Sequence, residues 1–241
     1  MKTEDLIADI ENARDASGLH SVVEKFAFSI GMDGAYIINF HPSAGMTFVD
    51  KRPDEWLNYY GKEGYIHFDP IAHRAFKGGE SFTWDDCIAN SQLTKGQKML
   101  MHQARDFGLN QGYNTVANTR DYSAATCCFY NRDSKDFFST MRFNRPLMDS
   151  VGHAAQNKLG RLVEESFEVP ALTSREVQCL TEAARGATNE VIGNLFNISK
   201  NTVNSHIQSA CKTLGVRTKI QAVSLAIQLK IIFPIKFTSL R

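Results

Sequence analysis

Residues 171–223 decide the fold of the C-terminal third, and they read ALTSREVQCLTEAARGATNEVIGNLFNISKNTVNSHIQSACKTLGVRTKIQAV. Thr173 and Glu176 have the spacing of a capping box at a helix start, and Thr218 and Gln221 repeat it. A glycine ends the first helix, and short turns with hydroxyl caps separate the helices that follow. The stretch therefore predicts four short helices in succession.

The third of these helices starts after the cap residue Ser199 and has two chemically distinct faces. One face is apolar at helical spacing, and the other carries hydrogen-bond donors, as in a helix that reads base edges and phosphates. We therefore predict an all-α, four-helix domain with a helix-turn-helix that binds DNA. In the preceding helix, the pattern turns Val191, Ile192 and Leu195 inward. The apolar face of the third helix would consist of Val203, Ile207, Ala210, Cys211 and Leu214. The predicted DNA-binding residues are Lys200, Asn201, Thr202, Asn204, Ser205, Gln208 and Lys212.

Charge is divided unevenly along the chain. From residue 170 to the end there are nine Lys and Arg against three Asp and Glu, a net charge of +6. Residues 1–169 carry a net charge of −5, so the whole chain has only +1. The alternative interpretation, a small four-helix unit with solvated polar faces, does not explain a basic domain beside an acidic one. The division favours DNA as a partner.

This stretch resembles the LuxR-type helix-turn-helix. Glu176, Leu180 and Gly186 stand at the spacing of that family, and ISKNTVNSHIQSACKTLGV is similar to its turn and recognition helix. The same module ends response regulators and other regulators, so the resemblance does not identify the input signal.

Length and composition suit two compact domains. The chain has 241 residues, of which 43% are hydrophobic and 22% charged. A charged helix end meets a proline and then a capped helix near residue 170. We therefore expect a larger domain at residues 1–166, a linker at 167–171 and the helix-turn-helix domain at 172–241.

Several kinds of site find no support in the sequence. The five cysteines form no Cys-x-x-Cys pair and have no histidine at metal-ligand spacing, which predicts reduced, mostly buried thiols in a cytoplasmic protein. We find no run of 18 apolar residues, so no membrane partner is expected. The sequence contains neither a Gly-x-Ser-x-Gly elbow nor a histidine cluster at metal-ligand spacing, so no motif indicates an enzyme. We therefore expect no catalytic residue, no metal-binding residue and no cofactor.

Residues 1–169 alternate between helical and strand-like patterns. Their order favours the α+β class, with an α-β-α sandwich around a five-stranded antiparallel sheet. The predicted strands are residues 35–40, 46–50, 81–84, 113–118 and 126–130. The predicted helices are residues 3–15, 19–31, 53–62, 70–77, 94–108 and 145–166.

Aromatic and polar residues recur at unusual spacing in this larger domain. Trp56 and Tyr60 are four apart on one helical face, and Asp69, Trp84 and Gly112 follow. Taken singly, each has an ordinary explanation as a core residue, a cap or a bend. Together, their steps of 4, 9, 15 and 28 resemble the autoinducer-binding domain of LuxR-type quorum-sensing regulators. Both domains thus resemble one family, in the right order.

The resemblance implies that the ligand, a small-molecule autoinducer, is an N-acyl-homoserine lactone buried between the sheet and one helix layer. It implies that the Trp56 indole N–H donates to the lactone carbonyl and that Asp69 accepts from the amide N–H. Tyr60 and Trp84 would wall the pocket, and Gly112 would support its structure.

Two candidate ligand-binding residues depart from the pattern of the family. Arg52 stands where many relatives carry a tyrosine that binds the amide carbonyl. It could replace that donor, reach a 3-substituent through water, or point to solvent, and we prefer the solvent interpretation. Cys128 stands where relatives often have Thr or Ser, which weakens any prediction of 3-oxo recognition. The acyl chain is therefore not predicted.

The resemblance also implies what the protein does. We expect a transcriptional regulator that binds promoter DNA at an inverted repeat as a homodimer and activates transcription with RNA polymerase. The helix at 145–166 would pack on the sheet and contribute to the dimer. The alternative is a regulator of the same fold that is ligand-independent or senses another small molecule, acting as a repressor or antiactivator. Residues 233–241 are assigned no role.

Overall fold

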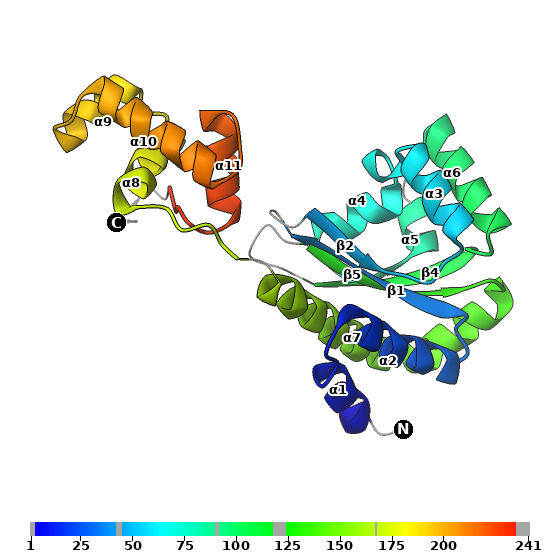
Figure 1. Cartoon of the computed structure of the whole chain (residues 1–241). Coiled ribbons are helices and arrows are strands. Elements are labelled where there is room, and N and C mark those ends of the chain that lie inside the picture. Colours follow the sequence, from blue (N-terminus) through cyan, green and yellow to red (C-terminus); the bar gives the residue numbers. More distant parts are fainter. Residues whose placement is uncertain (1–2, 42–44, 90–91, 118–123, 167, 235–241) are drawn as a thin grey trace, which may run out of the picture. The chain divides into compact units, whose positions relative to one another are not determined.

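The computed structural model describes residues 3–41, 45–89, 92–117, 124–166 and 168–234 (Figure 1). It divides into two compact units, Met1–Ser166 and Phe167–Arg241. Residues 235–241, most of the tail that was assigned no role, lie outside the described residues. Within the described ranges, no helix is both long and apolar enough to cross a membrane.

A five-stranded antiparallel sheet forms the centre of the first unit, which confirms the predicted fold class. The strand order is β2-β1-β5-β4-β3, and every neighbouring pair is antiparallel. The register sets Tyr36 opposite Cys128 and Cys128 opposite Asn114, so these three side chains form one row on one face. The strands are β1 Gly34–His41, β2 Gly45–Val49, β3 Phe82–Thr83, β4 Gln111–Ala117 and β5 Ala124–Asn131.

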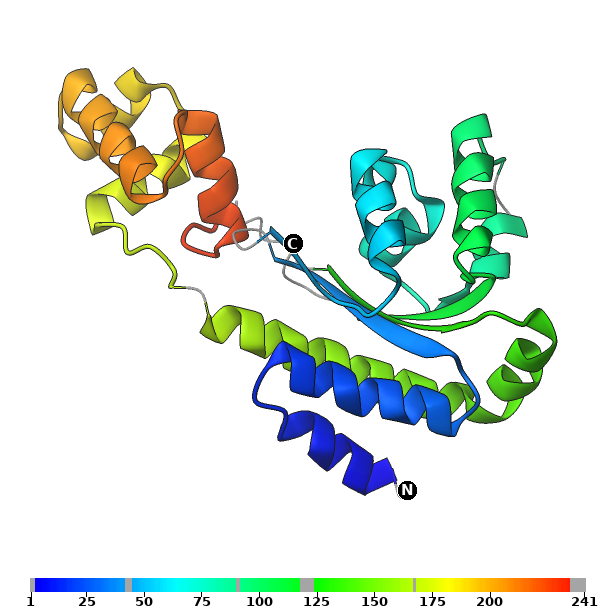
Figure 2. The ribbon, with the colours of Figure 1, turned by 45° about the vertical axis from the view of Figure 1, so that its right-hand side comes forward.

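Two helices, α2 Ala16–Ser29 and α7 Ser134–Glu165, cover one face of the sheet (Figures 1 and 2). A third, α1 Thr3–Glu11, packs on the outer side of these two helices. Their apolar side chains pack with alternate residues of β1, β4 and β5 into one core, in which Phe26 meets Phe129 edge-to-face at 5.7 Å. We call this side of the sheet the packed layer.

Shorter helices cover the opposite face, which we call the cavity layer (Figure 2). Local signals start two of them. Asp69 caps α4 with Pro70 in its first turn, and Thr94 and Gln97 form a capping box at α6. The elements are α3 Asp54–Lys62, the 3₁₀ turn η1 Tyr65–His67, α4 Pro70–Lys77, α5 Trp84–Ala89 and α6 Lys95–Asp106.

The described part of the second unit, residues 168–234, contains four helices, as predicted. Thr173 and Thr218 form the expected capping boxes, and Thr188 and Ser199 cap the two helices between them. Asn197 takes a left-handed conformation (φ 53°), which closes the tight turn before the third helix. The helices are α8 Ser174–Ala184, α9 Asn189–Phe196, α10 Lys200–Thr213 and α11 Lys219–Gln228.

Three local predictions were wrong. Helix α7 begins eleven residues before 145, because the buried Phe137 and Met141 continue its apolar stripe ahead of Pro146. Trp84 opens a short helix rather than ending a strand. On α9 only one of the three expected inward residues is buried.

In α9, Ile192 is fully buried, whereas Val191 is 54% and Leu195 57% exposed. The reason is the close packing beside Ile192. Gly193 approaches the next turn so tightly that a Cβ there would lie 2.7 Å from the Ile198 carbonyl oxygen. That contact fixes which narrow face of this short helix points inward.

Candidate functional site

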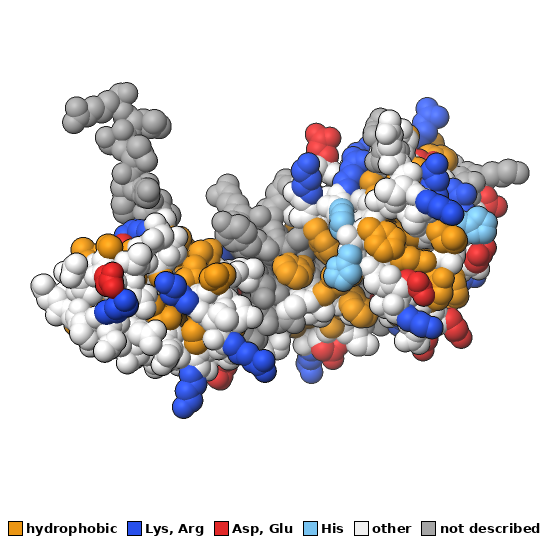
Figure 3. Space-filling model, turned by 90° about the horizontal axis from the view of Figure 1, so that it is seen from above, with side chains coloured by type: hydrophobic (Ala, Val, Ile, Leu, Met, Phe, Trp, Pro, Cys, Tyr) orange, Lys and Arg blue, Asp and Glu red, His pale blue; other side chains and the backbone are white. Residues whose placement is uncertain are grey.

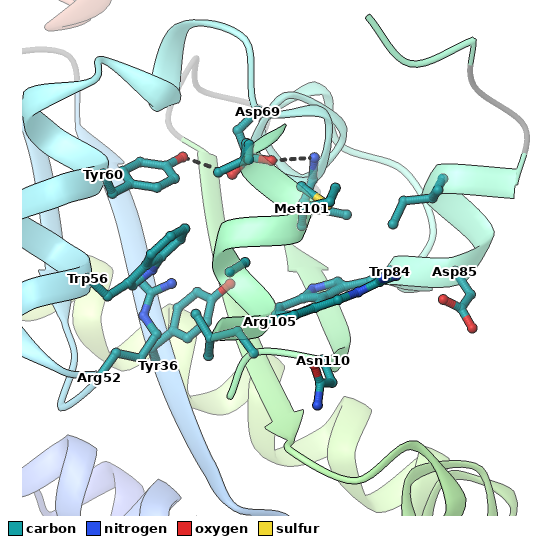
Figure 4. A pocket seen from close by; sticks show the side chains of 15 residues that line it. Tyr36, Arg52, Trp56, Tyr60, Asp69, Trp84, Asp85, Met101, Arg105 and Asn110 are labelled. Atoms are coloured by element: carbon teal, nitrogen blue, oxygen red, sulfur yellow. Dashed lines mark hydrogen bonds between the residues drawn. The ribbon is translucent and has the colours of Figure 1, made fainter. Parts of the chain in front are cut away.

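A cavity in two adjoining compartments lies between the sheet and the cavity layer. The smaller has a volume of about 50 Å³ and the larger about 230 Å³. Both are lined by Tyr36, Arg52, Tyr60, Asp69 and Ile71, so the compartments meet at these residues. Figure 4 shows the smaller compartment, where Tyr36 of β1, Trp56 and Tyr60 of α3 and Trp84 of α5 surround a common space. Five of the seven predicted ligand-binding residues therefore lie on one cavity, because Trp56 and Trp84 also line it.

Trp56 supplies a buried hydrogen-bond donor without an acceptor. Helix α3 carries Trp56 and Tyr60 on one face at i, i+4, with ring centroids 5.7 Å apart. Trp56 is 2% exposed, and its indole N–H has no hydrogen-bond partner among the described residues. A buried N–H left unpaired costs about 1–3 kcal/mol, so this position favours a ligand with an acceptor.

Asp69 supplies the matching acceptor. Its Oδ1 accepts from the backbone N–H of Ile71 at 2.8 Å and of Ala72 at 3.3 Å, and its Oδ2 accepts from the Tyr60 hydroxyl at 2.8 Å. Burial raises the pKa of Asp69, although the Tyr60 hydroxyl and both backbone N–H groups oppose the rise. Burial, together with Asp69, also raises the pKa of Tyr60, which therefore remains a neutral donor. A carboxylate oxygen has further lone pairs, so Oδ2 can accept another hydrogen bond.

Trp84 lies flat against the sheet because Gly112 has no side chain. A Cβ on Gly112 would come within 2.2 Å of the Trp84 ring. The Trp84 indole N–H donates to Asn114 Oδ1 at 2.8 Å, and the Asn114 amide donates to Thr126 Oγ1 at 2.9 Å. Gly112 thus does not line the cavity itself but makes room for one of its walls.

Arg52 is a correction, because the solvent interpretation was wrong. Only 13% of its side chain is exposed, and it lines both compartments. Its guanidinium lies 3.9 Å from the ring centroid of Tyr36 and forms an ion pair with Asp50, whose side chain is 1% exposed. Burial alone would lower the pKa of Arg52, but Tyr36 and Asp50 hold it above its ordinary value.

Cys128 lies beneath this site on β5. It is completely buried and opposes both Tyr36 and Asn114 in the strand register. Burial raises the pKa of the Cys128 thiol to about 12, so it is protonated and weakly polar. Cys128 is not among the lining residues of either compartment, although it lies beside Tyr36 on the same face of the sheet. All five cysteines are free and buried.

The larger compartment is mostly apolar. Asn114 and Thr126 add neutral polar groups at the sheet, and apolar side chains form most of the remaining wall. Sequence reasoning missed Asn114, Thr126 and Tyr36, whose signal is only their place in alternate strand positions on one face. The apolar lining residues include Ile38, Met46, Phe48, Leu57, Ile66, Ala72, Ala75 and Phe76.

In the second unit, α10 has the two faces that the sequence predicts. Val203, Ile207 and Ala210 are buried in the core of the unit. The polar face is exposed, and its only ion pair among the described residues joins Lys200 to Glu190 at 2.6 Å. The seven predicted DNA-binding residues, which are Lys200, Asn201, Thr202, Asn204, Ser205, Gln208 and Lys212, are all exposed.

Figure 3 looks onto the cavity layer and shows apolar side chains gathered among charged residues and histidines. Among the described residues, no group of three or more His, Cys, Asp or Glu is placed to hold a metal ion.

Comparison with known proteins gives matches to both units. Residues 15–159 match the family described as "Autoinducer binding domain", and residues 170–226 match the family "Bacterial regulatory proteins, luxR family". The chain is 27% identical over 225 residues to "Transcriptional activator protein VanR" of Vibrio anguillarum, covering 91% of this chain and 89% of that protein.

Two solved structures share the fold. The structure titled "SdiA in complex with octanoyl-rac-glycerol" has a TM-score of 0.69 at 20% identity and covers 94% of this chain and 93% of its own. The lactone-dependent LuxR family factor CepR2 of Burkholderia cenocepacia has a TM-score of 0.56 at 20% identity, covering 67% of this chain and 96% of its own.

Proposed function

The chain belongs to the LuxR family of bacterial regulators, with an autoinducer-binding domain and a DNA-binding domain, and we propose that it senses an N-acyl-homoserine lactone. The family consists of transcription regulators and not enzymes. Lactone binding would complete the core of the first unit and thereby permit promoter binding by the second.

One observation carries the proposal: the unpaired, buried Trp56 N–H and the buried Asp69 carboxylate line the same small compartment. A ligand that fits must bring an acceptor and a donor a few atoms apart. The lactone carbonyl and the amide N–H of an acyl-homoserine lactone provide this pair. We assign Trp56 to the carbonyl and Asp69 to the amide, while Tyr60 holds the Asp69 carboxylate in place.

The charge of the site favours a neutral ligand. Arg52 is already neutralised by Asp50, and the other two charged residues of the lining, Asp85 and Arg105, are exposed and opposite in sign, which leaves Asp69 as the charge inside the site. A carboxylate ligand, such as a lactone whose ring has been hydrolysed, would bring a second negative charge into a buried site, where like charges repel strongly. We therefore expect the closed lactone to bind and its hydrolysed form to be excluded.

The larger compartment suits the acyl chain. Away from the sheet and from the shared residues Arg52, Tyr60 and Asp69, its wall is apolar, and each methylene that enters it contributes about 0.8 kcal/mol. Several methylenes would therefore supply much of the binding free energy, while the smaller compartment provides selectivity for the head-group.

We further propose that the protein acts in the cytoplasm as a homodimer that places two copies of α10 on an inverted repeat of promoter DNA. The exposed polar face of α10 would contact bases and phosphates. Activation together with RNA polymerase is the expected outcome, in keeping with relatives named transcriptional activators.

A second candidate is a regulator that senses a different acyl compound, and Arg52 favours it because its charge departs from the family's pattern. The SdiA structure is a complex with octanoyl-rac-glycerol. An acylglycerol has hydroxyl donors in place of the amide of a lactone. Asp69 could accept from such a hydroxyl. Under this candidate, as under a ligand-independent regulator of the same fold, the protein would repress transcription or block other activators.

The test is to purify the full chain from a lactone-free host grown with a mixture of acyl-homoserine lactones of varied chain length. A solvent extract of the protein is then examined by mass spectrometry. We expect one lactone at close to one per chain. A soluble protein that carries acylglycerol or no ligand contradicts lactone sensing and leaves the DNA-binding assignment intact.

Paired variants locate the site. Trp56→Phe keeps a ring of similar kind but removes the N–H, so lactone retention should fall at least tenfold. The matched control is Tyr113→Phe, since the Tyr113 hydroxyl bonds Asp149 in the packed layer. Equal loss in both variants would mean that the Trp56 effect is only structural.

A further inference from the structure

We propose that Arg52 is a specificity-determining residue that selects lactones with a carbonyl oxygen on the third carbon of the acyl chain. The inference rests on the proposed function, because it concerns the acyl group of the same ligand. Arg52 keeps N–H groups that no described residue binds.

One edge of the Arg52 guanidinium is held by Asp50. Its Nε donates to Asp50 Oδ2 at 2.6 Å, and its Nη2 contacts the same oxygen. The other carboxylate oxygen of Asp50 accepts from the backbone N–H of Arg52 at 2.8 Å. The carboxylate therefore fixes the position of the guanidinium from two directions.

The plane of the guanidinium is held as well. Arg52 lies over the ring of Tyr36, and Tyr36 is itself 5% exposed and seated on the sheet. No described residue accepts a hydrogen bond from Nη1. Nη1 and the outer N–H of Nη2 form a second edge with two nearly parallel donors, at a side chain that lines both compartments.

Counting donors and acceptors shows what this edge requires. With the lactone carbonyl on Trp56 and the amide N–H on Asp69, an unsubstituted acyl chain has only its amide carbonyl to offer Arg52. A 3-oxo chain has a second carbonyl two carbons further on, and the two oxygens can lie side by side. They match the guanidinium fork, which binds paired oxygens better than single ones.

The donors that the described strands add to the site are neutral. The Asn114 amide donates to Thr126 and the Thr126 hydroxyl to the Thr115 carbonyl, which leaves the Tyr36 hydroxyl and the weak Cys128 thiol. Arg52 is therefore the buried charged donor at this place, since Arg105, which also lines the smaller compartment, is exposed. Because Asp50 neutralises Arg52, this donor reads an oxygen without attracting an anion.

The test is a competition in the full chain. The protein is produced in a lactone-free host supplied with equal amounts of octanoyl- and 3-oxo-octanoyl-homoserine lactone, and the experiment is repeated with six- and ten-carbon pairs. Mass spectrometry of the extract gives the ratio retained. We expect an excess of the 3-oxo form on the order of 10- to 100-fold, as for one hydrogen bond to a charged group.

Variants assign the preference to Arg52. Arg52→Lys keeps the charge beside Asp50 but has no planar fork, so lactone is still retained and the ratio falls toward one. Lys51→Gln is the matched control, since Lys51 is a neighbouring base paired with Glu24 at the surface, and its ratio should equal that of the parent.

The outcomes separate the two proposals. A parent protein that retains both lactones equally, or an Arg52→Lys protein that keeps the full 3-oxo excess, overturns the role of Arg52 and leaves lactone sensing standing. A soluble parent protein that retains neither lactone overturns lactone sensing and this inference with it.

Discussion

The two sides of the sheet differ in how completely they are filled. In the packed layer, side chains of α1, α2 and α7 interlock with β1, β4 and β5 into a continuous apolar core. In the cavity layer, aromatic residues surround two compartments, and the buried Trp56 N–H that lines one of them has no partner among the described residues. The same five strands thus serve a side that is filled by side chains and a side whose volume matches a ligand.

This difference indicates how binding can be coupled to folding. Side chains that border a cavity lack contacts on one side and so contribute less to stability. Binding sites are commonly drawn from the less stable parts of a fold. We infer that the packed layer provides ligand-independent stability and that the cavity layer provides the ligand-dependent part.

The largest expected effect comes from truncating the packed layer. Met148→Ala, at a fully buried position of α7, should lower the free energy of unfolding by about 2–5 kcal/mol with or without lactone. Met101→Ala, at a half-buried position on the cavity wall, should cost clearly less when no lactone is bound. Urea unfolding of both variants measures this. Equal costs would break the distinction between the layers.

The second effect is stabilisation by the ligand. At a lactone concentration a thousandfold above Kd, the free energy of unfolding should rise by about 4 kcal/mol, because the ligand binds only the folded protein. Trp56→Phe should lose most of this rise at the same concentration. Thermal unfolding across a lactone titration measures it. A rise that is undiminished in Trp56→Phe would contradict the assignment of that donor.

Gly112 in the cavity layer and Gly152 in the packed layer are in equally close contact with a neighbouring side chain. A Cβ on Gly112 would lie 2.2 Å from the Trp84 ring, and one on Gly152 would lie 2.1 Å from Thr115 Oγ1. Each alanine variant should lose about 1–3 kcal/mol of stability. Only Gly112→Ala should also weaken lactone binding, because it moves a cavity wall. Isothermal titration of both proteins tests this, and loss of affinity in Gly152→Ala would refute it.

Acidification should weaken binding through Asp69. Burial raises the pKa of this carboxyl, and the ionised carboxylate is the stronger acceptor for the lactone amide N–H. Affinity should therefore fall by up to about tenfold per pH unit as the pH drops through the raised pKa. The stability of the ligand-free protein should depend on pH in the opposite direction. The contribution of Asp69 to this stability is present below the pKa of Asp69 in the unfolded chain, and it is lost as the pH rises through its raised pKa in the folded protein. Asp69→Asn should bind weakly and without this pH dependence.

Much of the fold could be predicted from local signals. The capping boxes at Thr173 and Thr218 and the faces of α10 depend on neighbours within four residues, and the structure confirms them. The start of α7 was missed because Arg145 and Pro146 have the pattern of a helix beginning, while the continuing apolar stripe decides the boundary.

The site was harder to predict, because its geometry depends on contacts across strands. Trp56 and Asp69 were selected by resemblance, and their role in binding stays a prediction. The burial of Arg52 comes from Asp50 in the same loop and from Tyr36 on β1, a pairing that spacing along the chain does not indicate. Asn114 was missed because its importance comes from its contact with Trp84.

The smallest effect on the free energy of unfolding should come from Lys51, the neighbour of Arg52. Comparing the two residues distinguishes a charge at the surface from a charge in the cavity. Lys51 pairs with Glu24 of α2 at 2.7 Å, but 55% of its side chain is exposed. Because water screens such a pair, Lys51→Gln should change the free energy of unfolding by less than about 1 kcal/mol, and less still at high salt. Arg52→Gln would instead leave the buried Asp50 without its partner, a far more costly change. Urea unfolding of both variants at low and high salt tests the contrast, and a similar cost for the two residues would mean that burial in the cavity layer does not govern the strength of its charges.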